Sequence, residues 1–181
     1  MDRFALTGAA VFDGKTTVDG MAVTVRDGLV EAVCQITGLQ DGLSRVGLDG
    51  GLLAPGFIDI QVNGGSEVLL NESPTVEGVR AICEAHRRFG STALLPTVIT
   101  DRPEVTFAAI DAVSAAMAAG VPGCIGIHVE EPFISLARKS AHDPSLIWKM
   151  TDSDVDRLVA TSVRPLLLTV APESVSNEQI A

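Results

Sequence analysis

The chain has 181 residues, of which 46% are hydrophobic, and thirteen Lys and Arg against twenty-three Asp and Glu give a formal net charge of −10. This length suits one domain with at most a small appendage, and the apolar share is enough to bury a core. Because an acidic surface repels phosphates, the charge argues against nucleic acid and anionic membranes as partners. A small metabolite is the expected partner.

The N-terminus and the cysteines both indicate a cytoplasmic protein. The stretch MDRFALTGAA lacks the basic start and long apolar run of a signal peptide, and nowhere do apolar residues reach the roughly 18 needed for a membrane span. Cys34, Cys83 and Cys124 are odd in number and widely spaced in apolar surroundings. None lies in a C-x-x-C motif or beside a His, so we expect reduced, buried thiols without a catalytic or metal-binding role.

Residues 1–54 predict a small β unit. The alternating runs FALTGAAVFDG and GMAVTVRDGLVEAV are separated by turns rich in Gly and Asp, as in β-hairpins. We therefore expect short antiparallel strands here, packed beside the domain that follows.

From Pro55 onward the pattern changes to strands that alternate with amphipathic helices. The apolar runs predict strands at about 56–63, 92–98, 123–130 and 165–171. Continuous apolar strands separated by helices are typical of parallel β structure with helical crossovers. Because such crossovers are right-handed, the four strands are expected side by side, parallel and in sequence order.

Two helix boundaries can be predicted from capping residues. In SPTVEG, Ser73 is the expected N-cap with Pro74 at the first helical position, and Gly90 is the expected end of the same helix. A later helix is expected to open at Thr151 or Ser153, because acidic residues fill its first turn.

Polar residues stand at the ends of the predicted parallel strands, where this architecture gathers its active sites. Asp59, Gln61 and Asn63 share one strand face by their spacing of two, and three polar side chains on one face are not core. Glu130 ends the run GCIGIHVE. Because an ionised carboxylate at the end of a buried strand needs a partner, we predict that Glu130 holds a metal ion.

Position alone leaves simpler interpretations open for each of these residues. A Glu at a strand end is often solvated or paired with Lys or Arg, so Glu130 need not bind metal. His128, on an apolar strand, is more often a core histidine than a ligand. His86, near a helix C-terminus, is expected at the surface or paired with the helix dipole. His142, in the polar loop RKSAHDPS, is by default exposed.

Four segments, LLAPGFIDIQVNGG, GIHVEEPFIS, RKSAHDP and LLLTVAPE, occur in this order across residues 52 to 173. Together they resemble the N-acetylglucosamine-6-phosphate deacetylases of the amidohydrolase superfamily. The resemblance implies an α/β fold, a (β/α)8 barrel with a small β-sandwich built from both chain termini. Residues 1–54 then correspond to a sandwich segment, and residues 55–181 to about the first four barrel strands, a truncated half-barrel.

The resemblance also implies a site with one divalent metal ion, such as zinc or iron. Most amidohydrolases have H-x-H where this chain has Gln61 and Asn63, which is similar to the branch that works with a single ion. Glu130 matches the metal-binding Glu, and Ala141 and His142 match the segment that contacts the N-acetyl group. His142 would hydrogen-bond the amide carbonyl and polarise it. A water activated by the ion and an Asp would then release acetate and glucosamine 6-phosphate.

The sequence departs from the family pattern in two ways. Glu131 stands where the family usually has Gly; it can add a ligand, disturb the loop or face solvent, and we expect it to face solvent. The two metal-binding His, the catalytic Asp and the phosphate-binding Arg of the family match nothing in these residues and are expected downstream. The final SVSNEQIA resembles the start of another helix and favours truncation.

Three hypotheses follow. The first is the N-terminal portion of a deacetylase that forms a homodimer when complete, as the family does, with the 181 residues alone inactive and without tightly bound metal. The second is a non-catalytic half-barrel that acts as a binding or assembly module. The third is another amidohydrolase with a different N-acyl substrate.

Overall fold

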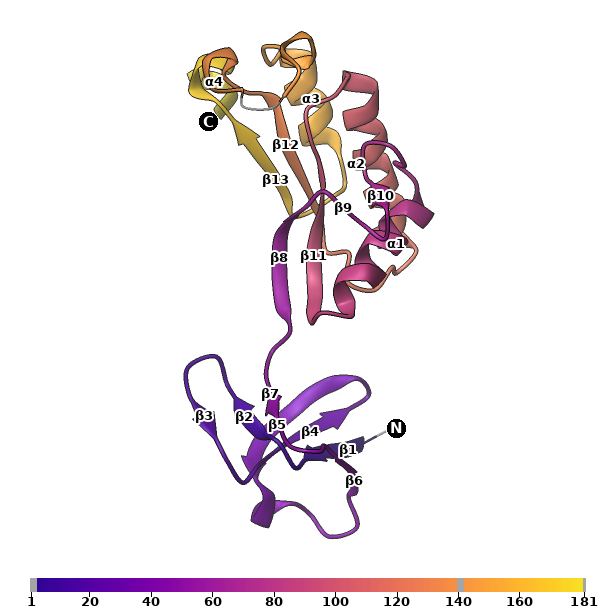
Figure 1. Ribbon diagram of the computed structural model, residues 1–181, viewed down its shortest axis with the longest axis vertical. Coiled ribbons are helices and arrows are strands. Elements are labelled where there is room, and N and C mark those ends of the chain that lie inside the picture. Colours follow the sequence, from indigo (N-terminus) through magenta and orange to yellow (C-terminus); the bar gives the residue numbers. More distant parts are fainter. Residues whose placement is uncertain (1–2, 140–141, 181) are drawn as a thin grey trace. The chain divides into compact units, whose positions relative to one another are not determined.

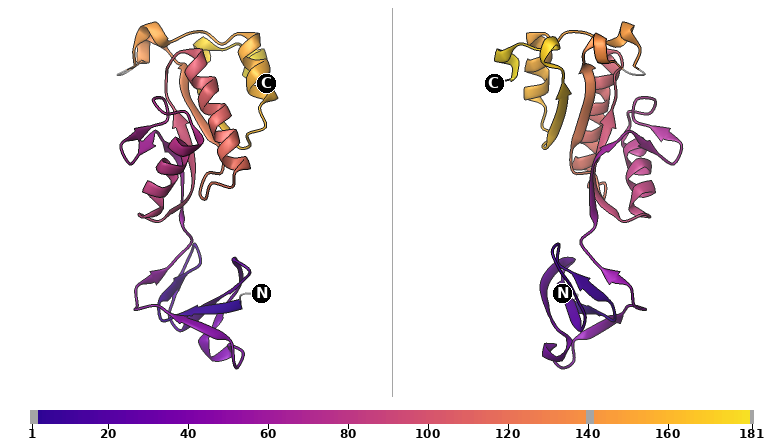
Figure 2. Two further views of the ribbon diagram at one scale, coloured as in Figure 1. Left: turned by 90° about the vertical axis from the view of Figure 1, so that its right-hand side faces the viewer. Right: turned by 60° about the vertical axis from the view of Figure 1, so that its left-hand side comes forward.

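The computed structural model describes residues 3–139 and 142–180, which form two compact units, Met1–Pro55 and Gly56–Ala181. Figures 1 and 2 show that the first unit is built from strands and that the α-helices belong to the second.

The first unit contains two small sheets. One has the strand order β5-β4-β1-β6 and the other β3-β2-β7. The elements are β1 (Arg3–Thr7), β2 (Ala10–Phe12), β3 (Thr17–Val18), β4 (Met21–Arg26), β5 (Leu29–Gln35), the 3-10 helix η1 (Ile36–Gly38), β6 (Ser44–Gly47) and β7 (Leu52–Leu53). The prediction of short strands is confirmed. The prediction of antiparallel pairing alone is wrong, because β6 pairs with β1, and β7 with β2, in parallel. Turn residues indicate hairpins between neighbours, but they do not indicate a strand that returns after a long connection.

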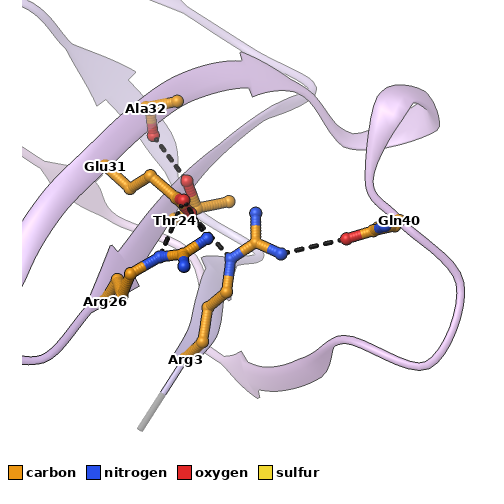
Figure 3. Close-up of polar contacts among 6 residues, drawn as sticks. All are labelled: Arg3, Thr24, Arg26, Glu31, Ala32 and Gln40. Carbon is orange, nitrogen blue, oxygen red and sulfur yellow. Dashed lines mark hydrogen bonds and ion pairs between the residues drawn. The ribbon is translucent and has the colours of Figure 1, made fainter. Parts of the chain in front are cut away.

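An ion-pair group joins β1, β4 and β5 (Figure 3). Arg3 and Arg26 lie directly opposite each other in the register, an arrangement that repels unless a carboxylate intervenes. Glu31 is that carboxylate: it accepts hydrogen bonds from Arg3 Nε at 2.8 Å and from Arg26 Nη2 at 2.6 Å. The hydrogen bond from Arg3, and then that from Arg26, lowers the pKa of Glu31 below its usual value.

The second unit is a parallel half-barrel with helices on one side (Figure 1). Its sheet has the order β13-β12-β11-β8, and each neighbouring pair is parallel. The strands are β8 (Phe57–Val62), β11 (Ser91–Val98), β12 (Ile127–Phe133) and β13 (Leu166–Val170). The predicted order, direction and approximate positions of the four strands are therefore confirmed.

The remaining elements connect these strands. The helices are α1 (Val76–Arg87), α2 (Pro103–Ala118), α3 (Asp152–Ala160) and α4 (Asn177–Ile180), and the short elements are β9 (Gly64–Gly65), β10 (Val68–Leu69), η2 (Leu136–Arg138), η3 (Pro144–Leu146) and η4 (Pro172–Ser174). The core lies between helices and sheet: Val79 and Ile82 of α1 and Val113 of α2 pack with Leu94 and Val129 of the strands, all fully buried. The edge strand β8 instead leaves Phe57, Ile58 and Ile60 more than half exposed.

The two helix starts show how well capping residues predict boundaries. The Thr151 prediction is confirmed: its hydroxyl accepts from Asp154 N, and the Asp154 side chain accepts from Thr151 N, a complete capping box. The Ser73 prediction is wrong, because Thr75 caps α1 by accepting from Gly78 N at 3.0 Å. The backbone oxygen of Ser73 instead accepts a hydrogen bond from Thr75 N in the preceding turn. Gly90 lies just beyond the helix, which ends at Arg87, and adopts a positive φ of 94°.

The cysteines differ in burial. Cys83 and Cys124 are 2% and 8% exposed and lie in the same core cluster, as predicted, whereas Cys34 is only part-buried on β5. All three are free thiols. A hydrogen bond with Cys124, and then burial, raises the pKa of Cys83.

We expect iodoacetamide to alkylate Cys34 first in the native protein. Burial keeps the reagent away from Cys83 and Cys124, and the raised pKa of Cys83 further reduces its share of reactive thiolate. Peptide mass spectrometry after timed labelling at pH 8 measures the order, and urea-unfolded protein is the control in which all three sites react. Labelling of native Cys83 as fast as Cys34 would contradict the burial.

Candidate functional site

The carboxyl ends of β8, β11 and β12 meet at one cleft of about 390 Å³. The lining residues are Gln61, Asn63, Ile99, Thr100, Glu130, His142 and Asp143. They come from the ends of three neighbouring strands and from the loop after β12, which is where parallel α/β folds place their sites. Sequence positions from 61 to 143 thus converge on one concave surface.

A side-chain hydrogen bond crosses the floor of this cleft. Gln61 Nε2, at the end of β8, donates to Glu130 Oε1, at the end of β12, although β11 lies between the two strands. Glu130 is half-buried, so its carboxylate has lost part of its water and gains a donor in exchange. The carboxamide therefore orients the carboxylate within the cleft.

Asn71 fixes the end of β11 beside the cleft. Its Oδ1 accepts from Ile99 N at 3.0 Å, and its Nδ2 donates to Ile99 O at 3.1 Å and to Asp101 Oδ2 at 3.0 Å. The side chain thus pairs with both backbone groups of Ile99, as a neighbouring strand would.

The hairpin β9–β10 brings Asn71 to this position. Only glycine fits at Gly64, because a Cβ there would lie 2.2 Å from Val68 O. Asn63 O, just before the hairpin, accepts from Leu70 N at 3.1 Å and closes it.

The other two histidines lie outside the cleft lining. His128 is a buried core residue whose Nε2 lies 2.8 Å from Thr169 Oγ1, in line with the interpretation favoured above. His86 lies in the last turn of α1, where an interaction with the helix dipole was one expectation, but it also has a partner that was not predicted: it is part-buried, and its Nε2 lies 2.9 Å from Gly64 O, which connects α1 to the hairpin. Its basic neighbours indicated a helix end, but they could not indicate which backbone turn lies next to that end.

The predicted site residues are distributed as follows. Gln61, Asn63, Glu130 and His142 line the same cleft, and His142 is half-buried there rather than fully exposed. Ala141 and the side chain of Glu131 lie outside the described residues. The metal-binding and catalytic roles assigned to these residues stay predictions.

Three cleft residues were not predicted: Ile99, Thr100 and Asp143. Thr100 is buried and lies just after β11. Asp143 follows His142, and its Oδ1 accepts from the backbone N of Ser145 at 2.8 Å and from its hydroxyl at 2.7 Å. These hydrogen bonds lower the pKa of Asp143 and make it the N-cap of η3. The Asp-Pro pair was the available signal for that turn.

Some of the side chains that line the cleft are of types that bind divalent ions. A carboxylate, an imidazole and carboxamide oxygens all ligate such ions. Within the described residues, however, no group of three His, Cys, Asp or Glu side chains is placed to hold one. Glu130 fits as one ligand of a set that these residues do not complete.

The described helices include none that is long and apolar enough to cross a membrane.

The architecture and the strand-end cleft define a parallel α/β half-barrel, and comparisons with known proteins specify it further. The family described as the NagA composite domain matches residues 3–53. N-acetylgalactosamine-6-phosphate deacetylase of Shewanella sp. (strain ANA-3) is 41% identical over 96% of this chain and 44% of its own. N-acetylglucosamine-6-phosphate deacetylase of Haemophilus influenzae is 28% identical over 95% of this chain and 45% of its own.

Solved structures agree with these relatives. N-acetylglucosamine-6-phosphate deacetylase from Pasteurella multocida matches with a TM-score of 0.86 at 25% identity, over 96% of this chain and 46% of that one. A mutant of the enzyme from Mycobacterium smegmatis, in complex with N-acetyl-D-glucosamine-6-phosphate, matches with a TM-score of 0.79 at 26% identity. The chain belongs to the NagA family of amidohydrolases, and it spans about half the length of the relatives it matches.

We expect Asn71→Ala to lower the free energy of unfolding by about 1–3 kcal/mol, because it leaves the backbone groups of Ile99 without their partner. Urea denaturation of the variant and the parent protein measures the difference. Asn177→Ala, at the exposed start of α4, is the matched control and should change stability by less than about 0.5 kcal/mol. Equal stability of the Asn71 variant and the parent would show that this side chain does not hold the end of β11.

Proposed function

We propose that, in a protein where this chain is joined to the rest of the barrel, the cleft hydrolyses the N-acetyl group of an amino-sugar 6-phosphate and releases acetate. The observation that carries the proposal is the meeting of Gln61, Glu130 and His142 in one strand-end cleft. The chain's identity to named deacetylases of this substrate class supports it. The expected setting is a cytoplasmic homodimer.

In this proposal each described residue has a distinct task. Glu130 holds one divalent ion, zinc or iron or a similar metal, which when bound supplies Lewis-acid polarisation of the scissile carbonyl. Gln61 orients Glu130 through the hydrogen bond between them, as partners of metal ligands commonly do. His142 donates a hydrogen bond to the amide carbonyl oxygen and stabilises the negative charge that develops there. Ala141, which lies outside the described residues, would by the resemblance belong to the segment that contacts the N-acetyl group.

Two substrates remain as candidates within this class. N-acetylglucosamine 6-phosphate is the substrate implied by the sequence motifs. It is also the sugar phosphate in the name of the relative from Haemophilus influenzae. N-acetylgalactosamine 6-phosphate is the second candidate, because the relative of that name shares 41% of its residues with this chain. The two sugars differ only in the orientation of one hydroxyl group, so the same cleft chemistry serves either.

We expect Glu130→Gln in the full-length protein to lower bound metal and acetate release together. The substitution keeps the size of the side chain but removes the charge that would hold a divalent ion. Metal content by plasma mass spectrometry and acetate by a coupled assay measure the two losses.

Glu104→Gln is the matched control for this experiment, since it removes the same charge from the exposed first turn of α2. It should leave both quantities unchanged, and Glu131→Gly should do so as well. The role of Glu130 is wrong if the Glu130 variant retains stoichiometric metal and normal turnover.

We expect acetate release from at least one of the two 6-phosphates to exceed that from the unphosphorylated sugar by about 100-fold or more in kcat/KM, because a site built to pair with phosphate is left unpaired without it. Steady-state assays with both phosphates and both free sugars provide the comparison, and the phosphate with the larger kcat/KM is the substrate. Equal rates on phosphorylated and free sugars would contradict the proposed substrate class.

A further inference from the structure

An extra residue interrupts the pairing of β8 with β11 just before the cleft. On β11, Leu94 and Pro96 are two residues apart. Their partners on β8, Asp59 and Val62, are three residues apart. The additional residue makes a bulge that includes Gln61, and a bulge of this kind turns a side chain in a new direction. The regular alternation of strand faces therefore does not by itself set the direction of Gln61.

The hydroxyl of Thr97 bridges the two strands at this bulge. Thr97 is fully buried, and its Oγ1 accepts from Val62 N at 2.8 Å and donates to Leu95 O at 3.1 Å. Because a hydroxyl group can accept and donate at once, this side chain joins a backbone donor of β8 to a backbone acceptor of β11. The bridge fixes the peptide group between Gln61 and Val62.

Side chains thus hold both peptide groups next to Gln61. Thr97 holds the one that follows, and Asp59 holds the one that precedes, since its Oδ1 accepts from Gln61 N at 3.1 Å. The two peptide planes that meet at a Cα atom fix the direction of its Cβ. Core packing of the buried Val62 side chain holds the next Cα, but it does not by itself prevent a tilt of the plane before it.

The reach from Gln61 to Glu130 leaves little slack for such a tilt. The carboxamide of Gln61 donates to Glu130 although β11 lies between their strands. Neighbouring strands are about 4.8 Å apart, so the two side chains together span roughly 10 Å. A tilt at the base of a long side chain grows toward its end, where the hydrogen bond is made.

We infer that Thr97 is a positioning residue for Glu130: its hydroxyl fixes the peptide plane after Gln61 and so directs the Gln61 carboxamide to the Glu130 carboxylate. The inference rests on the proposed function, in which Glu130 holds the ion and Gln61 orients Glu130. Thr97 lies outside the cleft lining and is assigned no contact with ion or substrate. A metal ligand whose orienting partner is displaced binds its ion more weakly.

Thr97→Val in the full-length protein tests this inference, because valine keeps the shape of threonine and lacks its hydroxyl. We expect the dissociation constant for Zn²⁺ to rise about 10-fold, the lower end of the effect of losing an outer partner of a metal ligand. Competition with a chelator, starting from metal-free protein, measures this constant. Thr97→Ser keeps the hydroxyl and should stay within about 2-fold of the parent protein.

Thr106→Val is the matched control for this experiment. Thr106 is also buried, on α2, and its hydroxyl has no hydrogen-bond partner among the described residues. The control therefore removes a buried hydroxyl without releasing a backbone group. It should leave the affinity for Zn²⁺ unchanged.

A double-mutant cycle separates positioning from general stability. In a Gln61→Leu background the carboxamide is absent, so Thr97→Val should cost almost nothing further in Zn²⁺ affinity. An equal fold loss in both backgrounds, or parental affinity in the Thr97→Val protein, overturns the inference. If Thr97→Val does not fold, Thr97→Cys, whose sulfur is a weak acceptor, takes its place in the same cycle with a smaller loss expected.

Acetate release by the parent protein keeps the two proposals distinguishable. A parent protein that binds Zn²⁺ but releases no acetate from either 6-phosphate refutes the proposed function, while the affinities of the Thr97 variants still decide the inference. A parent protein that binds neither Zn²⁺ nor Fe²⁺ refutes both. An active parent protein whose Thr97→Val variant behaves like Thr106→Val refutes the inference alone.

Discussion

The hydrogen bond from Gln61 to Glu130 depends on the curvature of a parallel sheet, and the rest of the candidate site depends on that curvature too. Neighbouring strands lie about 4.8 Å apart, so β8 and β12 are separated by roughly 10 Å across β11. Two long side chains span that gap when the carboxyl ends of their strands lean toward each other. The same leaning forms the cleft, with β11 held in place by Asn71 and the outer rim supplied by the loop after β12.

Sequence reasoning predicted the parallel sheet because its evidence is local: apolar runs, helical periodicity between them and turn residues at the joints. The spacing of two along each strand also placed Gln61 and Asn63 on one face. Asn71 was missed because it binds backbone groups that lie far away in the sequence. A backbone carbonyl looks the same at every position, so no residue pattern marks it as a partner.

Helices cover one side of the half-barrel, whereas its two edge strands are open. Helices bury Val79, Val113 and Val129 completely, whereas β8 exposes most of Phe57 and Ile58. In the sheet of described residues, β8 and β13 are the outermost strands, and each has one neighbour. Unpaired edges beside apolar side chains invite pairing with further strands, and closure of a barrel removes such edges. The edges thus agree with a chain that spans about half of its relatives.

The two sheet patterns have different consequences while the protein is being made on the ribosome. In the half-barrel, β11, β12 and β13 each pair with the long strand synthesised before them, so every new strand finds a finished template. In the first unit, the pairing of β1 with β6 cannot form until β6 has been synthesised; in it, Phe4 lies opposite Ser44. The pairing of β2 with β7 likewise requires β7. Contacts of such separation form late, because the loop between them must close first. The first unit therefore completes its two sheets only after residues 47 and 53 have emerged, whereas the half-barrel grows strand by strand in the direction of synthesis.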